Sequence, residues 1–392
     1  MQMIRNTGKP QANFWIKKPK TNSLILVDYK SQANATTVSQ ETYFDGEYKS
    51  GYQRQLDFYA YLLKQQNLKE KISEDQRNGI FSRIKPIVDL NDAVRDSDLV
   101  IEAVPEIMDL KKKVYAELDK ASNDQVIFAS NTSTLPITEI ANTISRPDKF
   151  IGIHFFNPPL LMKLVEVIPG QETSKDVIDL TINFVKSINK IPVICRKDVP
   201  GFIVNRLFIP LVHEACYVME RQKIQQTEID SAVKFRLGFP MGIFELADFT
   251  GLDVIHKATI EMHERDKKVI LPHPTIEQLF NEKKLGQKSG EGFYKYSDDK
   301  YERIPLSEEL AQKCDPVQII ANILNNAAWL VTNNASDIDE IEKAANLGLG
   351  LKKPLFDTAK EMGIKKIVEE LKKLSKKHGA FYEPDPLLLS MC

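Results

Sequence analysis

Glycine is scarce in the first part of this 392-residue chain. Only Gly8, Gly46, Gly51 and Gly79 precede Gly152, and the pattern Gly-x-Gly-x-x-Gly occurs nowhere in the sequence. Closely spaced glycines let a strand turn sharply into a helix, and they let the backbone approach a pyrophosphate. The sequence therefore lacks the usual glycine-rich loop that binds the phosphates of a dinucleotide.

Other features are also missing, and each absence excludes a class of protein. The cysteines form no Cys-x-x-Cys pair, which argues against a cysteine-based zinc site and a disulfide framework and favours a reducing cytoplasm. No run approaches the roughly 18 apolar residues that span a bilayer, and no apolar run follows the basic start, so a secretory signal is not expected. The net charge of −1 favours neither nucleic acid nor a membrane as a partner. The four cysteines are Cys195, Cys216, Cys314 and Cys392.

The pattern of apolar and polar residues changes class near Asp198. Before it, short apolar runs such as DLVIEAV (98–104), QVIFASN (125–131) and KFIGIHFF (149–156) alternate with segments of helical periodicity. Strands that alternate with helices of about ten residues indicate crossover units and a parallel sheet. After Asp198 the strands nearly vanish. We therefore expect an α/β part over residues 68–197, followed by an all-α part.

The helical part contains a loose internal repeat. Its first copy runs from DVPGFIVNRL to IDSAVKFRLGFPMGIFELADFTGLDVI, and its second runs from CDPVQIIANIL to IDEIEKAANLGLGLKKPLFDTAKEMGIKKI. Each copy has a long helix, an acidic helix start, a glycine-rich turn and a helix that begins near a proline. The repeat predicts two helical domains, over 198–305 and 306–392, of which the second is truncated.

His154 and Glu166 form a candidate catalytic pair. Oxidation of a secondary alcohol requires removal of the hydroxyl proton, and histidine is the natural base because it titrates near neutral pH. A neighbouring carboxylate can fix the tautomer of the ring and stabilise the imidazolium. His154 ends a predicted parallel strand, where open sheets bind their ligands, and Glu166 follows after a proline-rich turn.

Polar side chains near this pair could bind the oxygen of a substrate. The segment SNTSTLP (130–136) directly follows a predicted strand, and DVPGFIVNRL (198–207) opens a helix with Asn205 in its first turns. Hydroxyl and amide groups at these places can bind an oxygen as it becomes a carbonyl.

Five motifs occur in a fixed order along the chain. They are SNTSTLPITEIA, IGIHFFNPPLLMKLVEVIPG, KDVPGFIVNRL, GFPMGIFELADFTGLD and GQKSGEGFYKY. In this order and at this spacing they resemble the L-3-hydroxyacyl-CoA dehydrogenase family over residues 68–392. The resemblance implies an incomplete Rossmann-like parallel sheet over 68–197, followed by tandem helical domains.

The resemblance also implies roles for single residues. By it, His154 is the catalytic acid/base, Glu166 is its partner, and Ser133 and Asn205 contact the 3-oxygen of the substrate. The implied reaction is NAD-dependent oxidation of an L-3-hydroxyacyl thioester of coenzyme A, as in fatty acid β-oxidation, by a monomer or homodimer. Without the resemblance, the charges of Lys111 and Lys288 would be interpreted as ordinary solvated charges. The positions that match the lining of the cofactor are Glu106, Lys111, Asn131, Ser133, Asn157 and Lys288.

The N-terminal segment departs from this family. LILVDYKSQ and the following YKSGYQRQLDFYAYLLKQQ resemble a fragment of a RecB/Cas4-like PD-(D/E)xK nuclease. In that family Asp28 would bind a metal, Lys30 would be catalytic, and a Q-x-x-x-Y pattern would lie on the predicted helix Tyr52–Gln66. Residues 1–27 contain no Asp or Glu, so the second carboxylate of such a site is missing. We therefore interpret residues 1–67 as an atypical N-terminal segment in which residues 12–67 resemble a nuclease fragment, and a metal-dependent nuclease is the less favoured alternative function.

Two alternatives for this segment stay open. Leu24–Tyr29 could be the second strand of the dehydrogenase sheet, with Asp28 as the acid that binds ribose hydroxyls. No first strand or glycine turn precedes it, so we prefer the nuclease-like interpretation; the other alternative is a segment that packs on the sheet without chemistry. Both ends of the chain look incomplete, which a fused or frameshifted gene would explain. The main alternative function is a catalytically inactive acyl-CoA-binding protein.

Overall fold

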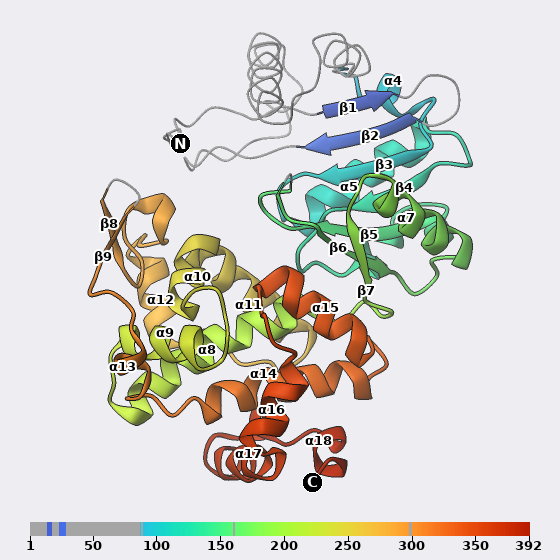
Figure 1. Cartoon of the computed structure of the whole chain (residues 1–392). Helices are drawn as coiled ribbons and strands as arrows, with labels where there is room; N and C mark the ends of the chain where they lie inside the picture. Colours follow the sequence, from blue (N-terminus) through green and yellow to red (C-terminus); the bar gives the residue numbers. More distant parts are fainter. Residues whose placement is uncertain (1–13, 18–22, 29–86, 88, 160, 298–299) are drawn as a thin grey trace. The chain divides into compact units, whose positions relative to one another are not determined.

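The structure is a computed structural model in which the chain divides into two compact units (Figure 1). The first unit comprises residues 1–132, 137–153 and 169–180, and the second comprises 133–136, 154–168 and 181–392. The residues described are 14–17, 23–28, 87, 89–159, 161–297 and 300–392, and of 14–17 and 23–28 only the backbone is described.

Within the part of the chain that the structure describes, seven strands follow one another in chain order in one sheet. They are β1 (Phe14–Lys17), β2 (Ser23–Asp28), β3 (Leu99–Ala103), β4 (Ile127–Ser130), β5 (Phe150–Phe155), β6 (Leu164–Pro169) and β7 (Ile191–Ile194). Strands β2, β3, β4 and β5 pair in parallel, β6 pairs in parallel with β7, and β1 is antiparallel to β2. The predicted, mostly parallel Rossmann-like sheet is confirmed.

Helix α5 (Met108–Ala121) packs on the sheet of the first unit through Tyr115. The Tyr115 ring lies edge-on to Phe128 and Phe150, with centroid distances of 5.8 and 4.7 Å. Its hydroxyl donates to the Ala129 carbonyl oxygen at 2.8 Å. Aromatic edge-to-face pairs of this kind add about 0.5–1.5 kcal/mol beyond the burial of their area. The position of α5 against β4 is thereby fixed.

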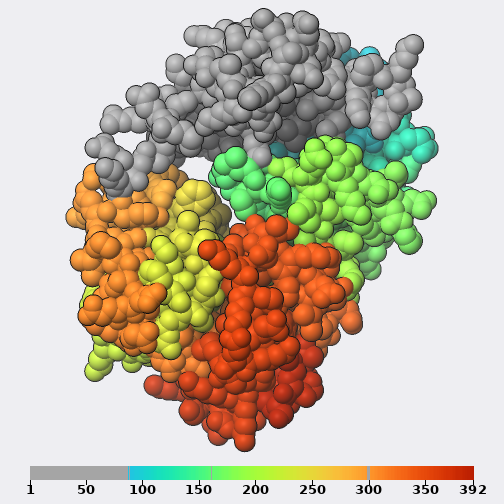
Figure 2. All heavy atoms as spheres, in the orientation of Figure 1, coloured from blue at the N-terminus to red at the C-terminus, as the bar shows by residue number. Residues whose placement is uncertain are grey.

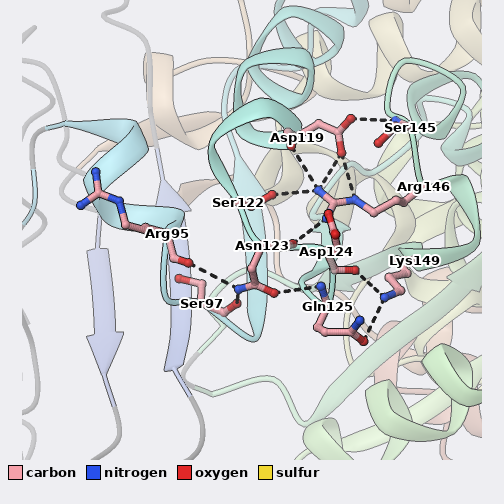
Figure 3. Close-up of polar contacts among 10 residues, drawn as sticks. All are labelled: Arg95, Ser97, Asp119, Ser122, Asn123, Asp124, Gln125, Ser145, Arg146 and Lys149. Carbon is pink, nitrogen blue, oxygen red and sulfur yellow. Dashed lines mark hydrogen bonds and ion pairs between the residues drawn. The ribbon is translucent and has the colours of Figure 1, made fainter.

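The connection between α5 and β4 is fixed by polar contacts (Figure 3). Arg146 donates from Nη2 to Asp119 Oδ1 at 2.8 Å, and from Nη1 to the Asn123 carbonyl oxygen at 2.5 Å. The Asn123 amide in turn donates to the Ser97 carbonyl oxygen, just before β3, at 3.2 Å. These contacts hold the beginning of β4 beside the beginning of β3. The resulting register places Ser130 opposite Glu102.

The second unit is mainly helical. The first helical repeat contains α8 (Val204–Gln222), α9 (Gln226–Phe235), α10 (Ile243–Thr250), α11 (Leu252–Arg265) and α12 (Pro274–Asn281). The second contains α14 (Val317–Thr332), α15 (Ile338–Leu349), α16 (Leu355–Met362), α17 (Ile364–His378) and α18 (Pro386–Ser390). A short hairpin, β8 (Lys295–Ser297) and β9 (Lys300–Glu302), lies between them. The change from α/β to helical structure is confirmed.

The two repeats share details that the sequence pattern alone did not contain. Asp230 of α9 accepts hydrogen bonds from the first backbone N–H groups of α10, and Glu342 of α15 does the same for α16. Gly251 precedes α11 with φ of 103°, and Gly363 precedes α17 with φ of 92°. Only glycine adopts such a conformation without strain. The internal repeat is therefore a repeat of structure.

The second repeat packs on the first through contacts between α14 and α8. Figure 2 shows residues of the second repeat, in deep orange to red, in the lower middle of the view. The second repeat also covers the edge strand β7. The Arg196 N–H donates to the Ala335 carbonyl oxygen at 2.7 Å, and the Ile194 N–H donates to Glu340 at 2.9 Å. Covering an edge strand removes a site for unwanted pairing. Among the described residues, none of the helices combines the length and the apolar character needed to cross a bilayer.

The strand predicted at Leu24–Tyr29 is β2, and it lies in the sheet beside β3. This parallel pairing agrees with the alternative that treats the segment as a strand of the dehydrogenase sheet. The expectation that no strand precedes this segment is wrong, because β1 pairs antiparallel with β2 and extends the sheet further. The predicted helix Tyr52–Gln66 lies outside the described residues, so the nuclease-like interpretation stays a prediction.

Candidate active site

His154 and Glu166 meet as the sequence predicts. His154 lies in β5 and Glu166 in β6, and the distance from His154 Nδ1 to Glu166 Oε2 is 2.8 Å. Both residues are buried, with relative exposures of 5% and 0%. The short connection from β5 to β6 thus brings together two polar side chains that are twelve positions apart.

The second carboxylate oxygen of Glu166 binds the start of helix α8. Oε1 accepts hydrogen bonds from the backbone N–H groups of Ile203 at 3.0 Å and Val204 at 2.9 Å. Two such donors and the partial positive charge of a helix N-terminus stabilise a carboxylate. Because a carboxylate only accepts hydrogen bonds, the neutral ring of His154 carries its proton on Nδ1. The basic lone pair of the ring is then on Nε2.

Ser133 and Asn205 also come together. Asn205, the second residue of α8, donates from Nδ2 to the backbone carbonyl oxygen of Ser133 at 3.0 Å. Ser133 begins the loop Ser133–Pro136, which belongs to the same compact unit as His154 and Glu166. The second unit therefore contains all four residues to which the resemblance assigns the chemical step.

The first unit contains a buried ion pair between β3 and α5. Lys111 Nζ lies 2.6 Å from Glu102 Oε1 and 3.3 Å from Glu106 Oε2. Lys111 and Glu102 are fully buried, whereas the Glu106 side chain is 39% exposed. An ordinary solvated charge at Lys111, which we would expect without the family resemblance, is therefore wrong. A buried charge is costly unless it is paired, so the Lys111 ammonium requires a carboxylate partner.

Glu102 is a further candidate residue for the site, and none of the motifs in the sequence indicates it. Besides the ion pair with Lys111, its carboxylate accepts hydrogen bonds from the Val104 N–H at 2.6 Å and from Ser130 Oγ at 2.7 Å. The available signal was a single acid inside the apolar run LVIEA, because a charge in a buried strand requires pairing. Glu102 fixes Lys111, which in turn contacts the more exposed Glu106.

These residues fit a dinucleotide at the carboxyl edge of the parallel strands. Glu106 lies in the connection that follows β3, which ends at Ala103, and its partly exposed carboxylate can accept a hydrogen bond from a ribose hydroxyl. A second contact to Glu106, from the Thr132 hydroxyl, comes from just after β4. The segments that follow β3 and β4 therefore both help to orient the Glu106 carboxylate.

The other predicted cofactor residues have separate surroundings. Lys288, in the 3₁₀ turn Gln287–Ser289, pairs with Asp253 of α11, and its side chain is 45% exposed. Asn157 is exposed, and the Asn131 N–H donates to the Glu102 carbonyl oxygen at 2.8 Å. The roles assigned to them stay predictions. The cofactor set divides into Glu106, Lys111 and Asn131 in the first unit and Ser133, Asn157 and Lys288 in the second.

Two family models match the chain. The model described as 3-hydroxyacyl-CoA dehydrogenase, NAD binding domain, matches residues 46–199. The model described as 3-hydroxyacyl-CoA dehydrogenase, C-terminal domain, matches residues 201–296. The first match begins at residue 46 rather than 68, so it includes part of the segment that we interpret as nuclease-like.

Individual relatives agree with these models. Mitochondrial hydroxyacyl-coenzyme A dehydrogenase of Rattus norvegicus is 46% identical over 228 residues, which are 58% of this chain and 72% of the relative. The structure of (S)-3-hydroxybutyryl-CoA dehydrogenase from Ralstonia eutropha is 35% identical, with a TM-score of 0.60 over 64% of this chain and 88% of that one. That of 3-hydroxybutyryl-CoA dehydrogenase from Escherichia coli K12 has a TM-score of 0.75 over 90% and 91% of the two chains. At 24% identity the last similarity shows the fold alone.

The Rossmann-like sheet and the matched NAD-binding domain define an NAD-dependent oxidoreductase that acts on a CH–OH group. More closely, the chain belongs to the 3-hydroxyacyl-CoA dehydrogenase family of fatty acid β-oxidation, with its NAD-binding and C-terminal domains.

Proposed function

We propose that His154 is the base that removes the 3-hydroxyl proton of an L-3-hydroxyacyl-CoA, which becomes the 3-oxoacyl-CoA. The observation that carries the proposal is the buried contact between His154 Nδ1 and Glu166. Because Glu166 is bound on its other oxygen by Ile203 and Val204, it keeps the ring proton on Nδ1 and leaves Nε2 basic.

Each of these residues then has a separate role in the oxidation. His154 Nε2 takes the hydroxyl proton, and the Glu166 carboxylate stabilises the imidazolium that forms. Ser133 and Asn205 bind the oxygen as it gains carbonyl character. NAD, when bound, supplies the acceptor for the hydride that leaves C3. A proton transfer of this type contributes about 10²–10⁴-fold to the rate.

On the cofactor side we propose that Glu106 accepts a hydrogen bond from a ribose hydroxyl. Its contact with the buried Lys111 limits the positions that its carboxylate can take. We keep Asn131, Asn157 and Lys288 as further residues that line the cofactor. Lys288 would then exchange its ion pair with Asp253 for contact with NAD.

The cellular setting and the oligomeric state are proposals as well. Cys195, Cys216, Cys314 and Cys392 are all free thiols, which favours a reducing compartment such as the cytoplasm. We propose a monomer or a homodimer. Analytical ultracentrifugation of the full chain separates the two.

A dehydrogenase assay tests the proposed reaction. Wild-type protein with NAD and L-3-hydroxybutyryl-CoA should form NADH, and His154→Ala should lower kcat by about 10²–10⁴-fold. The matched control is His378→Ala, because His378 is exposed at the end of α17. Equal turnover in wild type and His154→Ala would refute the role of the histidine.

The second candidate is an inactive protein that still binds acyl-CoA. It is favoured by the lack of any Gly-x-Gly-x-x-Gly pattern in the sequence. Calorimetry with NAD distinguishes the candidates, because tight NAD binding contradicts the inactive form. Absence of both NAD binding and turnover in the wild type would favour it.

A further inference from the structure

The last turn of helix α11 contacts the segment that leads into helix α8. Gly201 lies against Met262 of α11, and its φ is +78°. A Cβ atom at Gly201 would lie only 2.7 Å from Met262 Cε. The turn before α8 is therefore shaped to the surface of α11, so that residues near the end of α11 can influence Asn205.

Arg265, the last residue of α11, links two segments that are distant in sequence. Its Nη1 donates to the Thr134 carbonyl oxygen at 2.9 Å. Its Nη2 donates to the Asp198 carbonyl oxygen at 2.8 Å and to Asp198 Oδ1 at 2.9 Å. One guanidinium thus binds the loop Ser133–Pro136 and the start of the segment that leads into α8.

The surroundings of Arg265 limit its movement. Its side chain is 15% exposed and that of Asp198 is 8% exposed, so water screens this ion pair weakly. The neighbouring Asp266 pairs with Arg206 at 3.0 Å, and Arg206 lies 3.7 Å from the ring centroid of Trp329. Arg206 follows Asn205 directly, so the end of α11 supports both sides of the contact between Asn205 and Ser133.

We propose that Arg265 is a positioning residue for the oxidation. Arg265 binds the loop that contains Ser133, and it also binds the segment that precedes Asn205. It thereby orients Ser133 and Asn205 relative to each other. This inference rests on the proposed function, because it assumes that Ser133 and Asn205 bind the 3-oxygen of the substrate. Arg265 does not touch the reacting atoms, and acts through the Thr134 carbonyl and Asp198.

The geometry requires a guanidinium. Two different nitrogens of one planar group donate to acceptors on separate segments, and the shape of the group fixes the distance between them. A lysine ammonium is a point charge on a flexible stem, so it can pair with Asp198 without fixing Thr134. Arg265→Lys should therefore keep the charge but lose the alignment of the two segments.

Steady-state kinetics of Arg265→Met and Arg265→Lys in the full chain test the proposal. Misplacement of a substrate-binding group by about 1 Å can lower a rate by about 100-fold. We expect kcat with L-3-hydroxybutyryl-CoA to fall by about this factor in Arg265→Met, and by a similar factor in Arg265→Lys, because lysine keeps the charge but not the alignment. Millimolar guanidinium should restore part of the activity of Arg265→Ala.

The control is Arg236→Met, because Arg236 also donates to a backbone carbonyl, that of Cys314, but lies after α9. Hydrogen exchange should quicken at the amides of 133–136 in Arg265→Met and not in the control. Unchanged kcat and unchanged exchange in a folded Arg265→Met protein would overturn the inference. So would an equal loss of kcat in Arg236→Met. Failure of the proposed function is observed separately, as absence of turnover in the wild type.

Discussion

Replacement of Glu166 by glutamine tests whether the carboxylate sets the tautomer of His154. Glutamine has nearly the same size, but it has one acceptor oxygen and one NH₂ group. The N–H groups of Ile203 and Val204 both need an acceptor, so the amide oxygen should take the place of Oε1. The NH₂ group then faces Nδ1 of His154. Because it only donates, Nδ1 must accept, and the ring proton moves to Nε2.

The expected loss of activity is large. With its proton on Nε2, the neutral ring cannot take a proton from the substrate hydroxyl. The corresponding amide substitution in a Ser-His-Asp triad lowers kcat by about 10⁴-fold because it stabilises the wrong tautomer. Such a loss equals about 5.4 kcal/mol in the barrier, at 1.36 kcal/mol for each tenfold change. NADH formation from L-3-hydroxybutyryl-CoA should therefore fall by about 10⁴-fold in kcat.

The fold should survive this substitution, because each hydrogen bond of Glu166 has a replacement. Circular dichroism and the melting temperature check this point, and NAD affinity by calorimetry should not change. The matched control is Glu139→Gln, which makes the same chemical change in the partly exposed pair with Lys112. The tautomer argument is refuted if folded Glu166→Gln keeps kcat within about tenfold of wild type, far less than a wrong tautomer costs.

Two further predictions concern buried charges. Glu102→Gln should lower the free energy of unfolding by up to about 3–5 kcal/mol in urea denaturation, because it removes the nearer carboxylate of the buried Lys111 ammonium and leaves Glu106, at 3.3 Å, as the remaining ion-pair partner. The double variant Glu102→Gln/Lys111→Met should recover much of the loss, and a stability equal to wild type in the single variant would contradict the reasoning. Burial raises the pKa of Asp230 from the usual 3.8 to about 7, so the folded protein holds a proton that the unfolded chain releases between these values. The stability contributed by this proton is therefore lost as the pH rises through this interval. Between these pH values, the melting temperature of Asp230→Asn should depend less on pH than the melting temperature of wild type. An identical pH dependence in the two proteins would contradict the role of Asp230.

The fold followed from the sequence wherever periodicity was strong. The strands at 98–104, 125–131 and 149–156 were predicted because apolar runs bounded by charge are typical of buried parallel strands. The tandem helical repeat was predicted from matched motifs, since each copy repeats the same helix starts and turns. The capping of α10 by Asp230 was not predicted, because the two groups are fourteen positions apart and only packing brings them together.

The site was predictable only in part. His154 and Glu166 were found because the strand and turn pattern between them limits how far apart they can lie. The ion pair of Glu102 with Lys111 depends on how α5 crosses β3, and no local pattern fixes that crossing. Arg265 was missed for the same reason, since its acceptors lie 67 and 131 positions away in the sequence. Contacts over such separations follow from tertiary packing and not from propensity.

The sequence lacks a glycine-rich loop, but this absence does not remove the strand β2 from the sheet. Strand β2 pairs in parallel with β3 and places Asp28 opposite Ala103, while β3 places Glu102 opposite Ser130. In parallel strands these register positions share one edge of the sheet, and that is the edge where a strand-ending acid meets the ribose of a dinucleotide. The backbone pairing therefore favours the dehydrogenase interpretation of Ser23–Asp28 over the nuclease-like one. The sequence still offers no glycine pattern for the pyrophosphate.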